Sequence, residues 1–209
     1  MKASKVLEML NAGRIEDLKS ELRDEIYAEA LRTKPGAKRR YAAMKRYFRY
    51  SSTAREILLK PCMLEFEGKN YTSFCNGYSL ALTSEPCGAI ELCTEPDRYP
   101  QVTRLVNRNG DEGRLDIHDV IAKARAQGYK LKSSEIHGNG YLLRYGGAYF
   151  RIGLLDITYG IIDDGKEVVT YQTGNARSMT IENDIGVAVI MPVRIDGEPE
   201  EGVVVIEAD

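Results

Sequence analysis

The sequence predicts an α+β protein in which a helical N-terminal segment precedes a mostly antiparallel sheet with one or two helices. Up to about residue 50, apolar residues recur at three- and four-residue steps, which is the spacing of one helix face. From about residue 60, short apolar-polar alternations are separated by turn residues, which is typical of strands. We therefore divide the 209-residue chain into a helical, basic segment, 1–58, and a β-rich part, 59–209, which is one domain or two abbreviated repeats.

Three helices are expected in the first segment. Val6, Leu7 and Leu10 form a short apolar stripe that ends at residues 11–13. A second stripe follows at helical spacing and consists of Ile15, Leu18, Leu22 and Ile26. Residues 33–36, Thr-Lys-Pro-Gly, end that helix, and a third helix covers Ala37 to Tyr50.

The β-rich part begins as a meander of strands and tight turns. The turn signals are Glu-Gly-Lys-Asn at 67–70 and Asn-Gly at 76–77. One helix interrupts the strands, because Asp116 is a good N-cap and Gly128 follows the last apolar position. The later strand-like segments are 141–153, 167–174, 178–183, 186–195 and 202–208, whereas 154–165 has an apolar spacing that also allows a helix.

Composition and termini predict a cytoplasmic protein. Its four cysteines have no C-x-x-C spacing, so we expect reduced, packed thiols: Cys62, Cys75, Cys87 and Cys93. The N-terminus lacks the apolar core of a signal peptide, and no apolar run approaches the length of a membrane span.

The third predicted helix is strongly basic. Between Arg32 and Lys60 there are ten cations and one acid, Glu56. On a helical wheel its apolar residues share one face, and the cations Lys38, Arg39, Lys45, Arg46 and Arg49 occupy an adjacent arc. Such a helix could contact the phosphate backbone of nucleic acid through charge alone. The alternative is a solvated face whose long side chains cover neighbouring apolar surface.

No catalytic constellation is found, and we expect neither an enzyme nor a cofactor nor a metal site. His118 lies in a first helical turn, and His137 lies in the sequence His-Gly-Asn-Gly, which we interpret as a hairpin turn. Asp156, Asp163 and Asp164 offer too few oxygen ligands at fixed offsets for a hard cation. Asp-Asp-Gly at 163–165 is more simply a turn.

Four segments, taken in order, resemble the bacterial DNA polymerase III β subunit, the sliding clamp. Val-Ile-Met-Pro-Val-Arg-Ile at 189–195 is similar to the last strand of that family. Residues 74–82 resemble its turn and strand A-T-D-G-H-R-L-A, and residues 98–106 resemble its F-P-D-Y-x-x-V segment. Residues 150–183 resemble its short helix and following strands, which favours a helix for 154–162. The resemblance covers roughly 62–195 at low identity and implies a DNA-clamp-like fold.

The sequence also departs from the family. A clamp polypeptide carries two or three copies of its domain, and six copies close a ring around the duplex, whereas this chain has one domain or two abbreviated ones. Asn76, Tyr78 and Ser79 stand where the family has Asp, His and Arg. The chain continues past Ile195, and its last segment either adds a strand or covers the family's peptide groove.

The resemblance implies a groove for polymerase-type linear peptides. Transferred position by position, its wall is Gly77, Tyr78, Leu80, Met191, Pro192, Val193 and Arg194. The Met-Pro kink would turn the strand outward, so that Met191 and Val193 line an adaptable apolar pocket. The alternative is a core strand that leaves the sheet with Arg194 solvated.

Two functions follow from these patterns. The first is a non-enzymatic, clamp-like, DNA-associated protein, a homo-oligomer if it forms a ring, that binds nucleic acid backbone, replication-protein peptides or both. Its candidate DNA side is the basic helix together with Lys123, Arg125, Lys130 and Lys132. The second is a protein-interaction or regulatory module that has a clamp-like fold and does not bind DNA.

Overall fold

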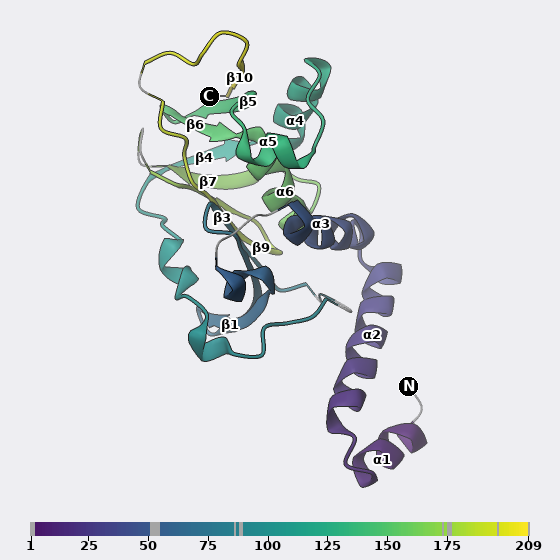
Figure 1. Ribbon diagram of the computed structural model, residues 1–209. Coiled ribbons are helices and arrows are strands. Elements are labelled where there is room, and N and C mark those ends of the chain that lie inside the picture. Colours follow the sequence, from purple (N-terminus) through teal and green to yellow (C-terminus); the bar gives the residue numbers. More distant parts are fainter. Residues whose placement is uncertain are drawn as a thin grey trace.

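The computed structural model describes residues 3–50, 55–85, 87, 90–172, 174, 177–195 and 197–208 (Figure 1). In these ranges the chain forms a large antiparallel sheet, a small three-stranded sheet and several helices. The predicted α+β class is therefore confirmed. No helix in the described ranges is both long enough and apolar enough to cross a membrane.

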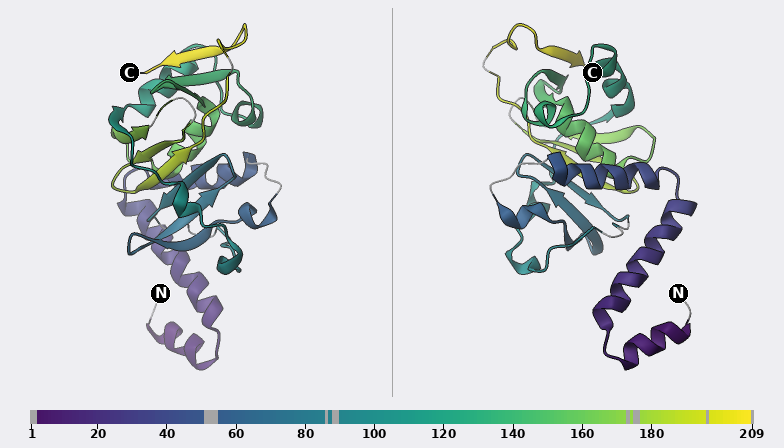
Figure 2. Two further views of the ribbon diagram at one scale, coloured as in Figure 1. Left: turned by 90° about the vertical axis from the view of Figure 1, so that its left-hand side faces the viewer. Right: turned by 45° about the vertical axis from the view of Figure 1, so that its right-hand side comes forward.

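The three N-terminal helices form where the apolar periodicity predicts them. They are α1 (Ala3–Asn11), α2 (Ile15–Thr33) and α3 (Ala37–Tyr50). Met9 and Leu18 are buried in the arm that α1 and α2 form, and this arm points away from the body of the molecule (Figures 1 and 2). By contrast, α3 lies against the body, and its side chains enter the main core. A division of the chain at residue 58 stays a prediction, although α3 packs with the β-rich part.

The large sheet has seven strands in the order β1-β2-β3-β9-β8-β7-β4, and every pair is antiparallel. Its strands are β1 (Cys62–Phe66), β2 (Lys69–Cys75), β3 (Ser79–Thr83), β4 (Asp111–Leu115), β7 (Val168–Gln172), β8 (Met179–Glu182) and β9 (Gly186–Ile190). The predicted meander from residue 62 is β1-β2-β3. The sheet joins this meander to β9, which follows about a hundred residues later in the sequence.

The small sheet has the order β10-β5-β6. Its strands are β5 (Tyr141–Tyr145), β6 (Ala148–Arg151) and β10 (Val204–Glu207). Because β10 runs parallel to β5, the C-terminal segment adds a strand, which is one of its two predicted roles.

Helix α6 (Ile152–Ile162) lies at the centre of the main core and resolves the ambiguity of this segment. It contacts α3, β3 and β9, and most of its side chains are buried all round the helix. Thr158 and Gly160, which are weak helix formers, are used in packing. Thr158 donates a hydrogen bond to Ser79 Oγ at 2.9 Å, and Gly160 allows Ala43 of α3 to approach closely.

A second, smaller core covers the opposite face of the sheet. Leu80 and Leu82 of β3 pack there with Val187 and Val189 of β9, whereas Ala81, between the two leucines, points into the main core. The single-turn helices η1 (Glu56–Leu59), η2 (Pro96–Arg98) and η3 (Val102–Leu105) cover this second core through residues such as Leu58 and Val102. Strands β3 and β9 are thus buried on both faces, which explains their nearly continuous apolar sequences.

The helix predicted after Asp116 is α4 (Ile117–Ala126). The Asp116 carboxylate accepts a hydrogen bond from the Asp119 backbone N–H at 3.0 Å, and Gly128 adopts a φ of 97° just beyond the helix end. The sequence did not predict α5 (Ser133–His137), so the described residues after 60 contain three α-helices instead of one or two. The interpretation of His-Gly-Asn-Gly as a hairpin turn is wrong, because these residues join α5 to β5.

Candidate functional site

The pairing of β3 with β9 brings two of the clamp-like segments together. Ser79 is paired with Ile190, so the Asn-Gly turn before β3 lies beside the Met-Pro segment after β9. The Met191 backbone N–H donates a hydrogen bond to the Tyr78 carbonyl at 3.0 Å. Tyr78 and Met191 are 49% and 39% exposed, so both present apolar surface where β3 begins and β9 ends.

Beyond Met191 the chain crosses from the large sheet to the small one. Pro192 has no N–H, so it cannot extend the ladder with β3. The Val193 N–H instead donates to the Tyr149 carbonyl at 2.7 Å and forms an isolated antiparallel bridge with the outer strand β6. The Met-Pro kink is therefore the point where the chain leaves one sheet and joins the other.

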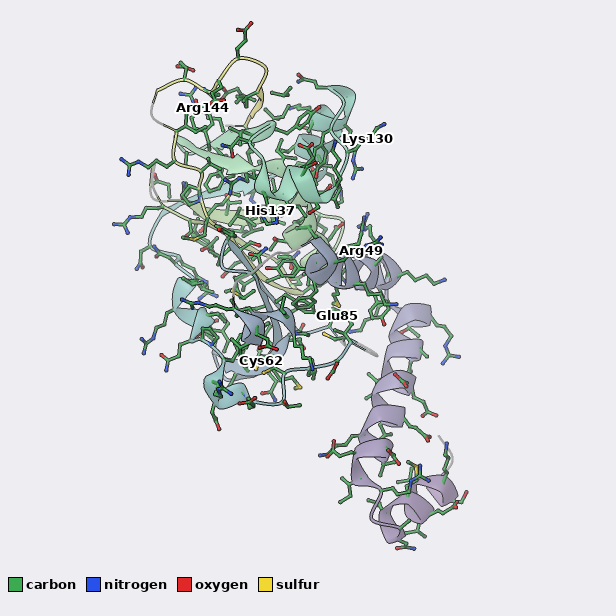
Figure 3. All side chains as sticks on the ribbon, viewed as in Figure 1. Arg49, Cys62, Glu85, Lys130, His137 and Arg144 are labelled. Carbon is green, nitrogen blue, oxygen red and sulfur yellow. The ribbon has the colours of Figure 1, made fainter. Side chains whose placement is uncertain are left out.

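A trough of about 750 Å³ opens beside this crossing. One wall consists of residues 191–195, and the other contains Arg144, Gly147 and Tyr149 of the β5-β6 hairpin. Gly197 and Glu198 close one end. The Arg144 guanidinium lies over the Tyr149 ring, 5.8 Å from the ring centre, and it is 3.5 Å from a Glu207 carboxylate oxygen. Figure 3 shows Arg144 on this part of the surface.

The predicted groove residues divide into three groups. Met191, Pro192, Val193 and Arg194 line the trough. Gly77 and Tyr78 do not line it, although they lie beside it through the Tyr78–Met191 hydrogen bond. Leu80 is fully buried in the second core, so its placement on a groove wall is wrong. The burial of β3 on both faces explains the error. Side chains alternate along the strand, so Ala81 enters the main core and Leu80 enters the second core.

The turn beside the trough is held by buried polar contacts. The side-chain oxygen of Asn76, which is almost completely buried, accepts hydrogen bonds from the N–H groups of Tyr78 and Ser79 at 2.9 and 2.8 Å. Gly77 between them has a φ of 88°, which favours glycine. The buried Tyr47 hydroxyl of α3 donates to the Ser79 carbonyl at 3.0 Å, and burial raises the pKa of Tyr47 well above its usual value, so it stays a donor.

Sequence reasoning missed the other residues at this surface. Arg144 and Tyr149 face the Met-Pro segment from β5 and β6, and the His137 ring lies edge-on to the Tyr78 ring at 6.4 Å. Arg151 donates to the Asn139 side chain at 3.0 Å, and burial lowers the pKa of Arg151. The groove positions transferred from the resemblance lie at β3 and β9 alone, so they carried no signal for these residues.

The buried face of helix α3 also includes residues outside the predicted apolar face. Ala37 and Met44 are buried, Tyr41 and Phe48 are half-buried, and Tyr47 is fully buried. Arg40, one of the cations counted in the basic stretch, is also buried. It donates to the carbonyls of Pro35 and Asp163 and lies 3.2 Å from Glu85, which is labelled in Figure 3 at the junction of α2 and α3.

The remaining predicted cations differ in their partners. Four of them lie close to a carboxylate. Arg39 lies 2.8 Å from Asp163, and Lys123 lies 2.7 Å from Asp119. Arg125 lies 3.6 Å from Asp156, and Lys132 lies 3.5 Å from Glu135. Lys45 lies 4.7 Å from the centre of the Tyr41 ring. The exposed side chains of Lys38, Lys45, Arg46 and Lys130 have no acid within ion-pair distance among the residues that the structure describes. Arg49 is also exposed and lies at the end of α3 (Figure 3). A role of these residues in binding nucleic acid stays a prediction.

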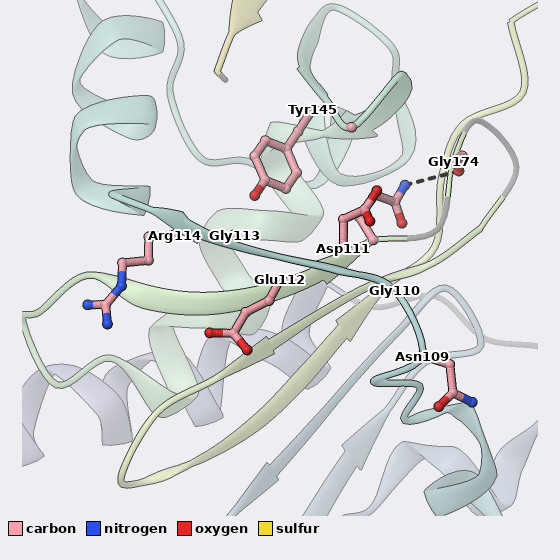
Figure 4. Close-up of a pocket in the computed structure, with 10 residues that line it drawn as sticks. Asn109, Gly110, Asp111, Glu112, Gly113, Arg114, Tyr145 and Gly174 are labelled. Carbon is pink, nitrogen blue, oxygen red and sulfur yellow. Dashed lines mark hydrogen bonds between the residues drawn. The ribbon is translucent and has the colours of Figure 1, made fainter.

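A second hollow, of about 770 Å³, lies where β4 meets the β5-β6 turn and the end of β7 (Figure 4). Its lining is rich in glycine, and the Tyr145 hydroxyl forms a hydrogen bond with the Thr170 hydroxyl at 2.7 Å. Asp111, Glu112 and Arg114 come from one strand, in which Glu112 and Arg114 lie on one face and Asp111 on the other, so the three side chains do not converge. In the described ranges, no three His, Cys, Asp or Glu side chains are grouped so that they could hold a metal ion.

No protein-family model matches the chain, and neither does any curated protein. Among solved structures it is similar to bacterial sliding clamps. A ligand-bound DNA polymerase sliding clamp from Pseudomonas aeruginosa is 17% identical, with a TM-score of 0.47 over 73% of this chain and 65% of the clamp. A C. crescentus beta sliding clamp with bound PEG is 13% identical, with a TM-score of 0.47 over 73% of this chain and 64% of the clamp. The DNA polymerase III subunit beta from P. aeruginosa is 16% identical, with a TM-score of 0.46 over 74% and 65%.

The chain thus spans slightly less than two thirds of the length of these clamps. The similarity is too low to show membership of their family, and it transfers no residue's role to this chain.

Proposed function

We propose that the chain is a non-enzymatic scaffold of clamp-like architecture that binds a linear peptide in the trough beside Met191–Ile195. The observation that supports this proposal most directly is the crossing of the chain from β9 to β6. It joins Val193 to Tyr149 through a backbone hydrogen bond, so that Met191, Pro192 and Val193 line an opening of about 750 Å³ together with Tyr149. The order of the four sequence segments that resemble a sliding clamp supports the same conclusion.

The trough has the properties that an extended peptide requires. Met191 is flexible and partly exposed, so it can adapt to different apolar side chains. The Val193 N–H already occupies the Tyr149 carbonyl at the outer edge of β6, so the peptide would be held mainly by side-chain contacts along the trough. Arg144 and Arg194 on opposite walls favour a peptide that carries an acidic residue beside its apolar anchor.

A pair of methionine variants tests the proposal. Met191 and Met63 are 39% and 50% exposed, but Met63 lies on the edge strand β1, outside the trough. The probe is a fluorescein-labelled linear peptide that carries an acidic residue beside an apolar anchor, and its fluorescence anisotropy is measured against protein concentration. We expect Met191→Glu to weaken binding about tenfold or more, and Met63→Glu to leave it unchanged. Equal affinities for the two variants, or no binding to the unmodified chain, would overturn the proposal.

Nucleic acid binding by α3 is the second candidate function. It is favoured by the exposed cations Lys38, Lys45 and Arg46, none of which has an acidic partner within ion-pair distance in the described residues. Backbone binding of this kind weakens linearly with the logarithm of salt concentration, with a slope of about −0.9 per phosphate contact on duplex DNA.

The test for this candidate is a salt titration with a fluorescent 20-base-pair duplex. We expect the double variant Lys38→Glu, Lys45→Glu to make the slope less steep by about two contacts. The matched control reverses two exposed cations that lie outside α3, Lys69 and Arg104, and should leave the slope unchanged. A slope near zero for the unmodified chain would exclude this function and favour a protein-interaction module.

A further inference from the structure

The helical arm carries a concentration of exposed apolar side chains. The described residues include ten large hydrophobic side chains that are exposed, and half of them lie on α1 or α2. These are Leu7, Leu10, Ile15, Leu22 and Ile26, with exposed fractions of 60, 49, 51, 39 and 55%. At 100° per residue, Ile15, Leu22 and Ile26 fall within about 40° of one another, so they form one stripe along α2. A soluble monomer rarely leaves such a stripe uncovered.

The arm and the helix that follows it have opposite charge. Helix α2 contains six acids and three bases, and α3 contains six bases and no acid. Glu25 and Glu29 flank the apolar stripe one helical turn apart, and both are exposed. On α3, Lys38 and Lys45 are exposed. The arm of one molecule therefore has both the charge and the apolar surface to bind a basic helix that lies beside an apolar recess.

Such a recess lies at the root of the arm. It has a volume of about 340 Å³ and is lined by Ile26 of α2 together with Met63, Tyr71, Ile90 and Leu92 of the body. The α2-α3 junction closes one end, where Glu85 lies 2.8 Å from Lys34 and 3.2 Å from Arg40. One chain thus carries an apolar acidic arm and, beside it, a surface complementary to that arm.

We propose that two copies of this chain form a dimer by exchanging arms, so that α2 of each copy lies along α3 and the recess of the other. This arrangement is isologous, because the same two surfaces meet twice around a two-fold axis. A 19-residue helix is about 28 Å long and about 10 Å wide. Two such contacts bury roughly 1,100 Å² in total, before any contribution from α1, which passes the threshold of about 1,000 Å² for a biological interface.

The first test is the mass of the full chain in solution, measured by light scattering and sedimentation equilibrium. We expect twice 23.4 kDa at tens of micromolar. The double variant Leu22→Asp, Ile26→Asp should be a monomer. The control Leu59→Asp, Leu105→Asp changes two leucines of similar exposure, 45 and 42%, on the body and should stay dimeric. Circular dichroism verifies that all forms are folded. A monomeric unmodified chain, or a dimer that both double variants leave intact, overturns the proposal.

The second test uses charge reversal and distinguishes arm exchange from pairing of two arms. One variant carries Glu25→Lys and Glu29→Lys on the arm, and the other carries Lys38→Glu and Lys45→Glu on α3. In homodimers of either variant, like charges meet at both contacts, and we expect the dissociation constant to rise about tenfold or more. In an equimolar mixture opposite charges meet at both contacts, so heterodimers should recover most of the lost affinity.

Pairing of two arms would leave the α3 variant dimeric, and the mixture would then show no recovery. That result overturns the exchange. Neither variant alters the trough at 191–195, so the peptide experiment remains an independent test of the proposed function.

Discussion

Replacement of Asn76 by alanine tests how the turn beside the trough is held. The Asn76 side-chain oxygen accepts hydrogen bonds from the Tyr78 N–H at 2.9 Å and from the Ser79 N–H at 2.8 Å, with the Ser79 hydroxyl at 3.3 Å. Alanine removes this acceptor and leaves the two N–H groups without it. Because the Tyr78 carbonyl accepts from Met191, the change also loosens the contact between the turn and the Met-Pro segment.

The size of the effect follows from the burial of the two donors. The Ser79 N–H is buried, and a buried donor without an acceptor costs about 1–3 kcal/mol. The Tyr78 N–H is partly exposed, so water can replace part of the lost bond, and its contribution is about 0–1 kcal/mol. We therefore expect Asn76→Ala to lower the free energy of unfolding by about 1–4 kcal/mol, with a central value of about 2.5 kcal/mol.

Equilibrium unfolding in urea measures this change. With an m-value of about 2.5 kcal/mol/M, the midpoint should fall by about 1 M. The control is Asn107→Ala, because the Asn107 side chain accepts one N–H, that of Asn109 at 2.9 Å, in an exposed loop. Its expected loss is below about 0.5 kcal/mol. If the two variants unfold at the same urea concentration, the buried acceptor does not stabilise the turn and the reasoning is refuted.

Three further predictions concern the core. Burial raises the pKa of both Cys62 and Cys87 to about 11, so their thiolate fraction at pH 8 is about a hundredfold lower than that of an ordinary thiol. The reaction of these two thiols with DTNB should be slower by at least this factor in the folded chain, and urea unfolding should remove the difference. Burial also raises the pKa of Asp156, so its ionisation opposes folding above the unfolded pKa of about 4. Asp156→Asn should therefore raise Tm at pH 7, with a gain that shrinks as the pH falls toward 4, and a constant difference would contradict this cause. A Cβ atom at Gly186 would overlap the Leu82 carbonyl oxygen across the β3-β9 ladder. Gly186→Ala should therefore lower the free energy of unfolding by about 3 kcal/mol or more, measured by thermal or urea unfolding. A decrease below about 1 kcal/mol would show that the two strands move apart easily.

Much of the secondary structure could be predicted because its signals are local. The stripe from Ile15 to Ile26 and the Pro-Gly turn after it define α2, and Asp116 with Gly128 defines α4. The missed elements lack such signals. Strand β4 reads Asp-Glu-Gly-Arg-Leu and lies at an edge of the sheet, where charged residues are common and apolar alternation is not required. Helix α5 has five residues, which is too short for a periodic pattern.

The candidate site was predicted in part. The resemblance placed Met191, Pro192 and Val193 at a groove, and these residues line the trough. It also placed Leu80 there, but the structure buries that side chain in the second core. Tyr149 could not have been found, because its contact with Val193 joins strands of two different sheets.

The sequence by itself determined the class of the fold, most of the helices and the turns between the first strands, since these depend on residues a few positions apart. It also determined that α3 is basic and α2 acidic. Only the tertiary structure decided which cations meet the chain's own carboxylates, because Asp163 comes near Arg39 through the packing of α3 on α6. The trough depends in the same way on the crossing from β9 to β6. Long-range packing and strand pairing create these contacts, and no local sequence pattern encodes them.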